Sequence, residues 1–131
     1  MKFYRCTNCN EIVIFRNEGK AVNCCDEAMI ELLPNQNEED SVANKPIIRR
    51  IGNLVTVLVG TEPHSMVDVH YIDFILLETN KGIYYKKLSL DDFAIADFLV
   101  HNKEEVVRAY AYCSNHFLWM TEDIKDYNND K

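Results

Sequence analysis

The sequence predicts an all-β protein in two parts, a small cysteine-rich module followed by an antiparallel β-sandwich. Three observations predict this organisation. Four of the five cysteines fall within the first 34 residues. Beyond residue 46, short stretches alternate apolar and polar side chains with the period of two that is typical of half-buried strands. Turn-forming residues, mostly asparagine and glycine, separate these stretches.

We expect the cysteine-rich module to span residues 1–36, a linker to span 37–45, and the sandwich to span 46–131. The linker region is polar and acidic and follows Pro34, which is typical of a connecting segment. The last stretch, 121–131, is also polar and acidic, and we expect it to fray.

The expected strands rest on alternation within three stretches. In residues 54–59, three valines share one face, and in residues 106–113, small side chains and Cys113 share one face. The strands are predicted at 54–59, 71–78 and 106–113, with hairpin turns at 52–53 and 80–82. Residues 91–96 are the exception, where a helical turn is the alternative.

Charge and hydropathy exclude several classes of function. The net charge of −7 argues against binding to nucleic acid or to anionic membrane surfaces. No run of about 18 apolar residues is present, so we expect no membrane-spanning helix. The first five residues lack the apolar core of a secretory signal, and we therefore expect a cytoplasmic protein. In that compartment, five cysteines indicate metal binding or redox chemistry rather than disulfides.

The first cysteine cluster has the spacing of a metal site. Cys6 and Cys9 form a C-x-x-C knuckle, and the adjacent pair Cys24 and Cys25 follows fourteen residues later. Four thiolates arranged as a tetrahedron suit zinc or iron, and the ligand type leaves both open. A module of about 35 residues is too short for a core alone to stabilise it, so a bound metal would supply much of its folding energy.

A second group of ligand-type residues lies in the sandwich. His64 and His70 precede one expected strand, and Cys113 and His116 form a C-x-x-H pair after another. Each histidine alone would be an ordinary surface residue, but the group together indicates a thiolate and imidazoles on one ion. His101 lies in a polar loop without a partner pattern, and we expect no ligand role for it.

These motifs carry a family resemblance that covers nearly the whole chain. The adjacent Cys24 and Cys25, followed by Met29 after three residues, resemble the desulforedoxin-type centre. Three further stretches resemble the V-P-H-P-M, H-Y-I and C-N-x-H-G-x-W motifs of desulfoferrodoxin, the two-iron form of superoxide reductase. They are Glu62-Pro63-His64-Ser65-Met66, His70-Tyr71-Ile72 and Cys113-Ser114-Asn115-His116-Phe117-Leu118-Trp119.

The resemblance implies a fold, a reaction and two iron ions per chain. The fold would be a desulforedoxin-like domain followed by an immunoglobulin-like β-sandwich, in a homodimer. Cys6, Cys9, Cys24 and Cys25 would bind one iron, for which zinc is a possible substitute. His64, His70, His116 and an axial Cys113 would bind the other, where superoxide would be reduced by one electron to hydrogen peroxide. The first centre would relay electrons from an external donor such as rubredoxin.

The chain departs from the family pattern at one ligand. The family takes its first histidine from a Lys-His-x-Pro segment before the sandwich, and counting back from His64 places Asn44 there. We therefore expect weaker iron binding and slower turnover, because an amide oxygen binds ferrous iron less well than an imidazole does. The alternatives are an electron-transfer or redox-sensing iron protein with a degenerate second site, and a structural zinc module that carries a binding sandwich.

Overall fold

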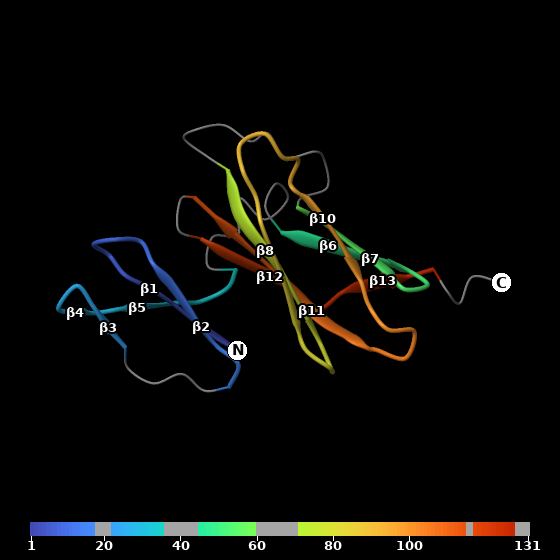
Figure 1. The fold of residues 1–131 in the computed structure, drawn as a ribbon, viewed down its shortest axis with the longest axis horizontal. Coiled ribbons are helices and arrows are strands. Elements are labelled where there is room, and N and C mark those ends of the chain that lie inside the picture. Colours follow the sequence, from blue (N-terminus) through green and yellow to red (C-terminus); the bar gives the residue numbers. More distant parts are fainter. Residues whose placement is uncertain (18–21, 36–44, 60–70, 115–116, 128–131) are drawn as a thin grey trace. The chain divides into compact units, whose positions relative to one another are not determined.

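The computed structural model describes residues 1–17, 22–35, 45–59, 71–114 and 117–127. Within these ranges the chain forms thirteen strands and no helix, so the expected all-β class is confirmed (Figure 1). Among the same residues, no helical segment could serve as a membrane span. The chain divides into two compact units, Met1–Pro34 and Asn35–Lys131, which are described separately below.

The first unit is a small sheet with a separate hairpin. Its three-stranded antiparallel sheet has the order β2-β1-β5, and a two-stranded hairpin carries the vicinal cysteines. The bounds are Lys2–Arg5 (β1), Ile12–Phe15 (β2), Asn23–Cys24 (β3), Glu27–Ala28 (β4) and Ile30–Leu32 (β5). Among the described apolar residues of this unit, Phe3, Cys6 and Met29 alone are buried, so its apolar core is very small.

The second unit is a sandwich of two four-stranded sheets. One sheet has the order β10-β7-β6-β13 and the other β12-β11-β8-β9. The bounds are Pro46–Ile51 (β6), Leu54–Val59 (β7), Ile72–Thr79 (β8), Ile83–Lys87 (β9), Ile95–Leu99 (β10), Val106–Cys113 (β11), Leu118–Thr121 (β12) and Ile124–Asp126 (β13). The three strands expected from alternation are all present, two with the expected bounds and one shifted by a single residue.

The core lies between the two sheets and follows the alternation in the sequence. Val55, Val57 and Val59 of β7 point inward, and Ala109 and Ala111 of β11 belong to the same buried core. Small alanines on β11 allow large side chains elsewhere in the core to interdigitate at native packing density. Trp119, at 1% exposure, is the largest of these fully buried side chains.

The structure decides against the helical turn that was the alternative for residues 91–96. Residues 91–96 contain no helical turn: the Asp92 amide donates to the Ser89 carbonyl at 3.0 Å, and β10 begins at Ile95. The Asp92 carboxylate also accepts from the Ser89 amide at 2.9 Å, and this local bond favours a turn over a helix.

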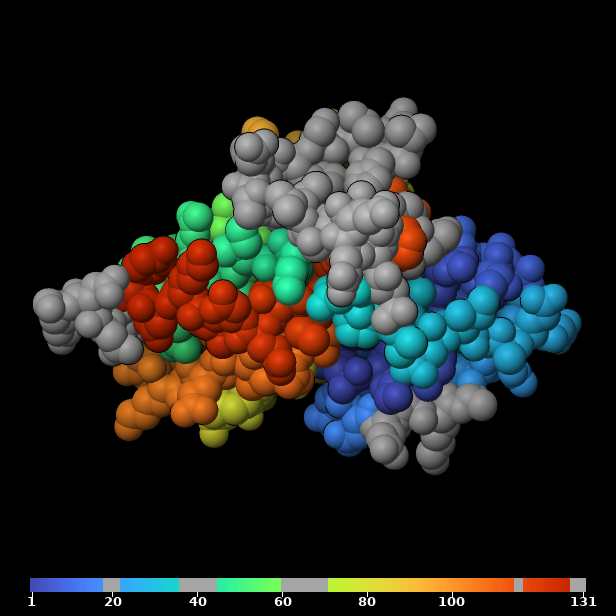
Figure 2. Space-filling view, turned by 180° about the vertical axis from the view of Figure 1, so that it is seen from behind, coloured from blue at the N-terminus to red at the C-terminus, as the bar shows by residue number. Residues whose placement is uncertain are grey.

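The stretch 121–131 was expected to fray, but its described part, 121–127, includes the strand β13, and residues 128–131 lie outside the described residues. β13 pairs with β6 in parallel register, with Lys125 opposite Arg49, so one ladder of the sandwich is not antiparallel. Ile124 packs against the core, which gives this otherwise polar segment an apolar anchor. Figure 2 shows the green strands β6 and β7 near the dark red C-terminal segment on one face of the molecule.

Candidate metal centres

The Cys6–Cys9 knuckle is closed by backbone hydrogen bonds directly after β1. The Cys6 amide donates to the Glu11 carbonyl at 2.9 Å, and the Asn10 amide donates to the Cys6 carbonyl at 2.9 Å. Asn10 adopts a left-handed conformation with φ of 63°, which asparagine tolerates better than most residues. The loop therefore returns on itself, and its two sulfurs join the cluster formed with Cys24 and Cys25.

The vicinal cysteines lie in a two-residue hairpin. Asn23 and Cys24 of β3 pair with Ala28 and Glu27 of β4, which leaves Cys25 and Asp26 as the turn. Both turn residues have positive φ, 53° and 62°, as a type I′ turn requires. For Cys25 this conformation costs about 1–2 kcal/mol. Backbone strain of this kind persists where function requires it, and here it brings two adjacent sulfurs together.

The four sulfurs converge with the spacing of a tetrahedral metal site. All four ligand atoms lie within 4.8 Å of one another, with 3.6 Å between Cys9 and Cys24 and 3.8 Å between Cys24 and Cys25. Metal–sulfur bonds of about 2.3 Å in a tetrahedron place the sulfurs about 3.8 Å apart. All five cysteines of the chain are described, and none forms a disulfide. The residues therefore fit a zinc or iron ion.

The electrostatics of the cluster favour a cation. Hydrogen bonds from the backbone amides of Cys9 and Asn8 to the Cys6 sulfur lower the pKa of that thiol to about 6. The pKa of Cys24 is raised, because hydrogen bonding to the Cys6 and Cys9 sulfurs favours its protonated form. The pKa of Cys25 is also raised, since the effects of Cys6 and Cys9 outweigh the hydrogen bond with Cys24. Without an ion, the thiols hold protons against one another's charge. A bound cation stabilises all four thiolates at once, and its binding releases those protons.

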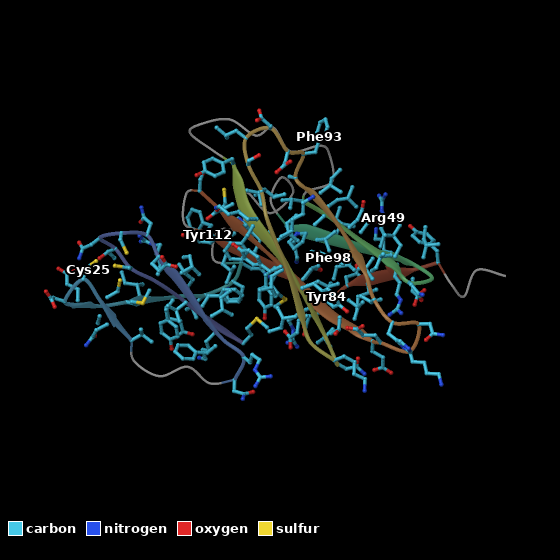
Figure 3. All side chains as sticks on the ribbon, viewed as in Figure 1. Cys25, Arg49, Tyr84, Phe93, Phe98 and Tyr112 are labelled. Atoms are coloured by element: carbon cyan, nitrogen blue, oxygen red, sulfur yellow. The ribbon has the colours of Figure 1, made fainter. Side chains whose placement is uncertain are left out.

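The centre is open to the surface of its unit. Cys6 is buried, but Cys9 and Cys25 are exposed, and Figure 3 shows sulfur atoms gathered near the labelled Cys25. An ion held here lies close to solvent, which suits either a structural ion or an electron relay.

The second group of predicted ligands is described in part. Cys113 ends β11, is fully buried in the sandwich core and donates its amide to the Phe117 carbonyl at 2.9 Å. The other predicted ligands of this site lie outside the described residues, as does the position that replaces the family's first histidine. These are His64, His70, His116 and Asn44.

A pair of hydrogen bonds joins the chain next to Cys113 to the chain next to His70. The Ser114 amide donates to the Tyr71 carbonyl at 2.8 Å, and the Tyr71 amide donates to the Ser114 hydroxyl at 2.9 Å. In the sequence, His70 directly precedes Tyr71 and His116 is two residues after Ser114. The sequence pattern gave no indication of this clamp, because it depends on pairing between segments that are 43 residues apart.

Strand directions place several chain ends at the same end of the sandwich. The register pairs Cys113 with Ile72 at the start of β8, and pairs Pro46 at the start of β6 with Val59 at the end of β7. The seven residues between β9 and β10 cross from one sheet to the other at this end. Cys113 therefore lies at the end of the sandwich where β6 and β8 begin and where β7 ends.

The opposite end of the sandwich holds a buried polar cluster. The Glu104 carboxylate accepts hydrogen bonds from the Thr79 hydroxyl, from the Tyr84 hydroxyl at 2.9 Å and from the His101 amide at 3.0 Å. Arg50 donates to the Glu104 and His101 carbonyls. The His101 ring accepts from the Lys103 amide at 3.1 Å, so this histidine belongs to a loop at the end away from Cys113.

The fold and the four-thiolate cluster define an all-β metal-binding protein with a small thiolate module and a sandwich. A family model for desulfoferrodoxin matches residues 34–122. A desulfoferrodoxin homologue from Archaeoglobus fulgidus is 33% identical over 92% of this chain and 96% of its own length. A desulfoferrodoxin from Nitratidesulfovibrio vulgaris is 31% identical over 92% and 95%. The chain belongs to the desulfoferrodoxin family.

A solved structure agrees with this assignment. The superoxide reductase from Treponema pallidum superimposes with a TM-score of 0.77 at 26% identity, over 92% of this chain and 97% of that one. The similarity spans both units, so it covers the thiolate module as well as the sandwich.

Proposed function

We propose that this protein is a superoxide reductase that uses two iron centres. The substrate, superoxide, takes up one electron and two protons and leaves as hydrogen peroxide. Family membership and the similarity to the Treponema pallidum enzyme support this reaction.

The chain's own residues would divide the work between two sites. Cys113, with His64, His70 and His116, would hold the reactive iron, which supplies the electron when it is bound. The Cys113 thiolate would raise the electron density on the metal, as a cysteine ligand does in haem enzymes. Cys6, Cys9, Cys24 and Cys25 would hold a second iron that takes electrons from a rubredoxin-like donor.

The burial of Cys113 beside the Tyr71–Ser114 clamp carries the proposal. A thiol at 0% exposure is shielded from solvent and from chance metals, so it is suited to a permanent ligand at one end of a rigid sandwich. The clamp joins the residue that follows His70 to the residue that follows Cys113. Two of the four proposed ligands are thus adjacent in sequence to residues that contact each other.

A second candidate is an electron-transfer or redox-sensing protein in which only the thiolate centre works. Asn44 favours it, because the family's first histidine is missing and three imidazoles bind iron less tightly than four. The ungapped pairing also lacks the family's lysine before that histidine, although a gapped pairing would place Lys45 there, and a chain of net charge −7 attracts a small anion weakly.

The two candidates differ in iron content and in reactivity. Iron-reconstituted protein should hold two iron ions per chain, and the reduced protein should consume superoxide in a pulse-radiolysis or stopped-flow assay. One iron per chain with no superoxide consumption would leave only the electron-transfer candidate.

Two substitutions test the assigned residues. Cys113→Ser should reduce the iron content from two to one and abolish superoxide consumption, because the hydroxyl does not replace a thiolate ligand. Ala111→Ser is the matched control, since it adds a hydroxyl to the same buried face of β11 and should retain both irons. Asn44→His should raise the iron affinity of the second site. An unchanged affinity would count against the missing histidine as the cause of weak iron binding.

A further inference from the structure

Three aromatic rings cross one sheet of the sandwich in a row. Tyr112 of β11 lies opposite Phe74 of β8, and Tyr85 of the edge strand β9 lies diagonally beside Phe74. The Tyr112 and Phe74 rings stack with their centres 5.4 Å apart, and the Phe74 and Tyr85 ring centres are 5.2 Å apart. We call these three residues the aromatic ladder. None of them belongs to the cluster between the sheets, so the ladder lies on the face of the sheet that points away from the core.

The two ends of the ladder differ in burial and in what they adjoin. Tyr112, which is labelled in Figure 3, is buried and directly precedes Cys113, the proposed thiolate ligand of the second iron. Phe74 in the middle is 2% exposed, whereas Tyr85 at the other end is 53% exposed. The ladder therefore leads from the residue before a proposed iron ligand to the surface of the sandwich.

A row of phenol, phenyl and phenol rings in contact is suited to moving single electrons. A phenol gives up an electron and its proton only to a strong oxidant. A phenyl ring between two phenols couples them without being oxidised itself. Superoxide reduction releases hydrogen peroxide next to a reduced iron ion, and peroxide with ferrous iron generates strong oxidants. The chemistry of the ladder therefore suits the removal of oxidising equivalents, and it plays no part in the ordinary turnover of superoxide.

We propose that the aromatic ladder carries oxidising equivalents from the second iron site to the surface, where they come to rest as a phenoxyl radical on Tyr85. This inference rests on the proposed function, which supplies both the peroxide and the ferrous ion. The O–O bond of hydrogen peroxide breaks as the peroxide takes one electron from the ferrous ion and one from the Tyr85 phenol. Two protons, one from that phenol and one from solvent, complete two water molecules. A small thiol in solution then returns a hydrogen atom to the Tyr85 radical.

The ladder would spare two residues that are otherwise the nearest targets. Cys113 is one, because a thiolate is oxidised in steps to acids that are not reduced again. Trp119 is the other, since it pairs with Ala111 and so lies diagonally from Cys113 within the same core. The buried indole nitrogen of Trp119 has no hydrogen-bond partner among the described residues, so its oxidation would leave an unpaired charge in the core. Tyr85 avoids this cost, because its half-exposed side chain can release its proton to water.

Peroxide treatment of the reduced, iron-loaded protein tests where the oxidation ends. A nitroso spin trap followed by mass spectrometry of tryptic peptides should find the radical adduct on Tyr85. Tyr85→Phe keeps the ring and removes the phenol, so it should abolish this adduct and shift oxidation to Cys113 and Trp119. Tyr127→Phe is the matched control, because Tyr127 is an exposed tyrosine at the end of the other sheet, and it should leave the Tyr85 adduct unchanged.

Two further variants test the path itself. Phe74→Leu removes the ring between the two phenols and should lower the yield of Tyr85 adduct per bound iron. A role in packing alone would lower the thermal stability of this variant without changing that yield. Cys113→Ser, which removes the second iron and keeps the thiolate centre, should give no Tyr85 adduct, because the oxidation begins at the second site.

The outcomes separate the ladder from the proposed function. Superoxide consumption measured on the same samples should be retained in Tyr85→Phe. A protein that holds iron at the second site but consumes no superoxide would refute the proposed function, and its reaction with added peroxide would still decide on the ladder. An iron-loaded protein without an adduct on Tyr85, or an equal adduct in Cys113→Ser, would overturn the ladder alone. A second site that binds no iron would overturn both.

Discussion

The two units of this protein are stabilised in different ways. The sandwich has a continuous core of sixteen buried residues from both sheets, whereas the first unit buries very few apolar side chains among its described residues. What the first unit has instead is a cluster of four cysteine sulfurs that lie within 4.8 Å of one another. The comparison teaches that a short unit can replace a core with a coordinated ion, and it then depends on that ion for its fold.

Loss of one sulfur should have the largest effect and should be confined to the first unit. Cys24→Ser removes a sulfur that lies 3.6 Å from one neighbouring sulfur and 3.8 Å from another, so the first unit should lose its metal and its amide protection in hydrogen exchange. The sandwich should keep its protection. Thr7→Ser, in the same loop, keeps the hydroxyl that contacts Glu27 and should change neither unit. Equal loss of protection in both units would contradict their independence.

A substitution in the core of the sandwich should affect only the sandwich. Leu77 is fully buried in the core, and Leu77→Ala should lower the free energy of unfolding of the sandwich by about 2–5 kcal/mol through the cavity it leaves. Urea denaturation followed by Trp119 fluorescence measures this loss. Metal content of the four-thiolate centre should be unchanged, and a parallel loss of that metal would show that the units are coupled.

The polar cluster at the far end of the sandwich should make its stability depend on pH. Hydrogen bonds from the Thr79 hydroxyl and then the His101 amide lower the pKa of Glu104 below its ordinary value of 4.5. The stabilisation is therefore complete above that value and is lost as the pH falls through the lower folded-state pKa.

Glu104→Gln should remove this acid dependence and cost about 1–3 kcal/mol at neutral pH, because a buried acceptor is lost. Denaturation curves between about pH 3 and 7, which covers the range where carboxyl groups titrate, measure both the acid dependence and the loss at neutral pH. Glu105→Gln, at the exposed neighbour, should leave the pH profile as it is. A profile that Glu104→Gln does not flatten would assign the acid sensitivity to another group.

The smallest effect should come from backbone conformation in the knuckle. Asn10→Ala forces a β-carbon into the left-handed region without the local hydrogen bonding that asparagine offers, at about 1 kcal/mol. Zinc affinity of the first unit should fall by about fivefold, measured by competition with a chelator. Asn10→Gly should retain or improve it, and an affinity order of alanine above glycine would refute the conformational explanation.

Local patterns predicted the fold class and the four-cysteine cluster, whereas long-range pairing escaped prediction. The C-x-x-C spacing and the vicinal pair are visible in the sequence because each pair of ligands comes from one tight loop. Residues in such a loop are close together in the sequence. Alternation revealed β7, which buries one face, and β11, in which small side chains and Cys113 share the core face, although Tyr110 and Tyr112 on its other face are buried as well. The parallel pairing of β13 was missed because a single apolar residue, Ile124, anchors it within a polar segment.

The buried polar cluster was also invisible in the sequence. Arg50 and Glu104 are 54 residues apart, and each resembles an ordinary surface charge until the fold brings them together. The Tyr71–Ser114 clamp is similar, because serine and tyrosine carry no pattern that predicts their pairing.

The type I′ turn at Cys25 and Asp26 has a consequence for how the first centre is loaded. The turn sets the positions of two neighbouring sulfurs through the backbone alone, so the hairpin acts as a rigid chelating pair. An ion that binds here therefore joins two preformed pairs of sulfurs, the hairpin pair and the Cys6–Cys9 knuckle, whose loop is closed by its own backbone hydrogen bonds.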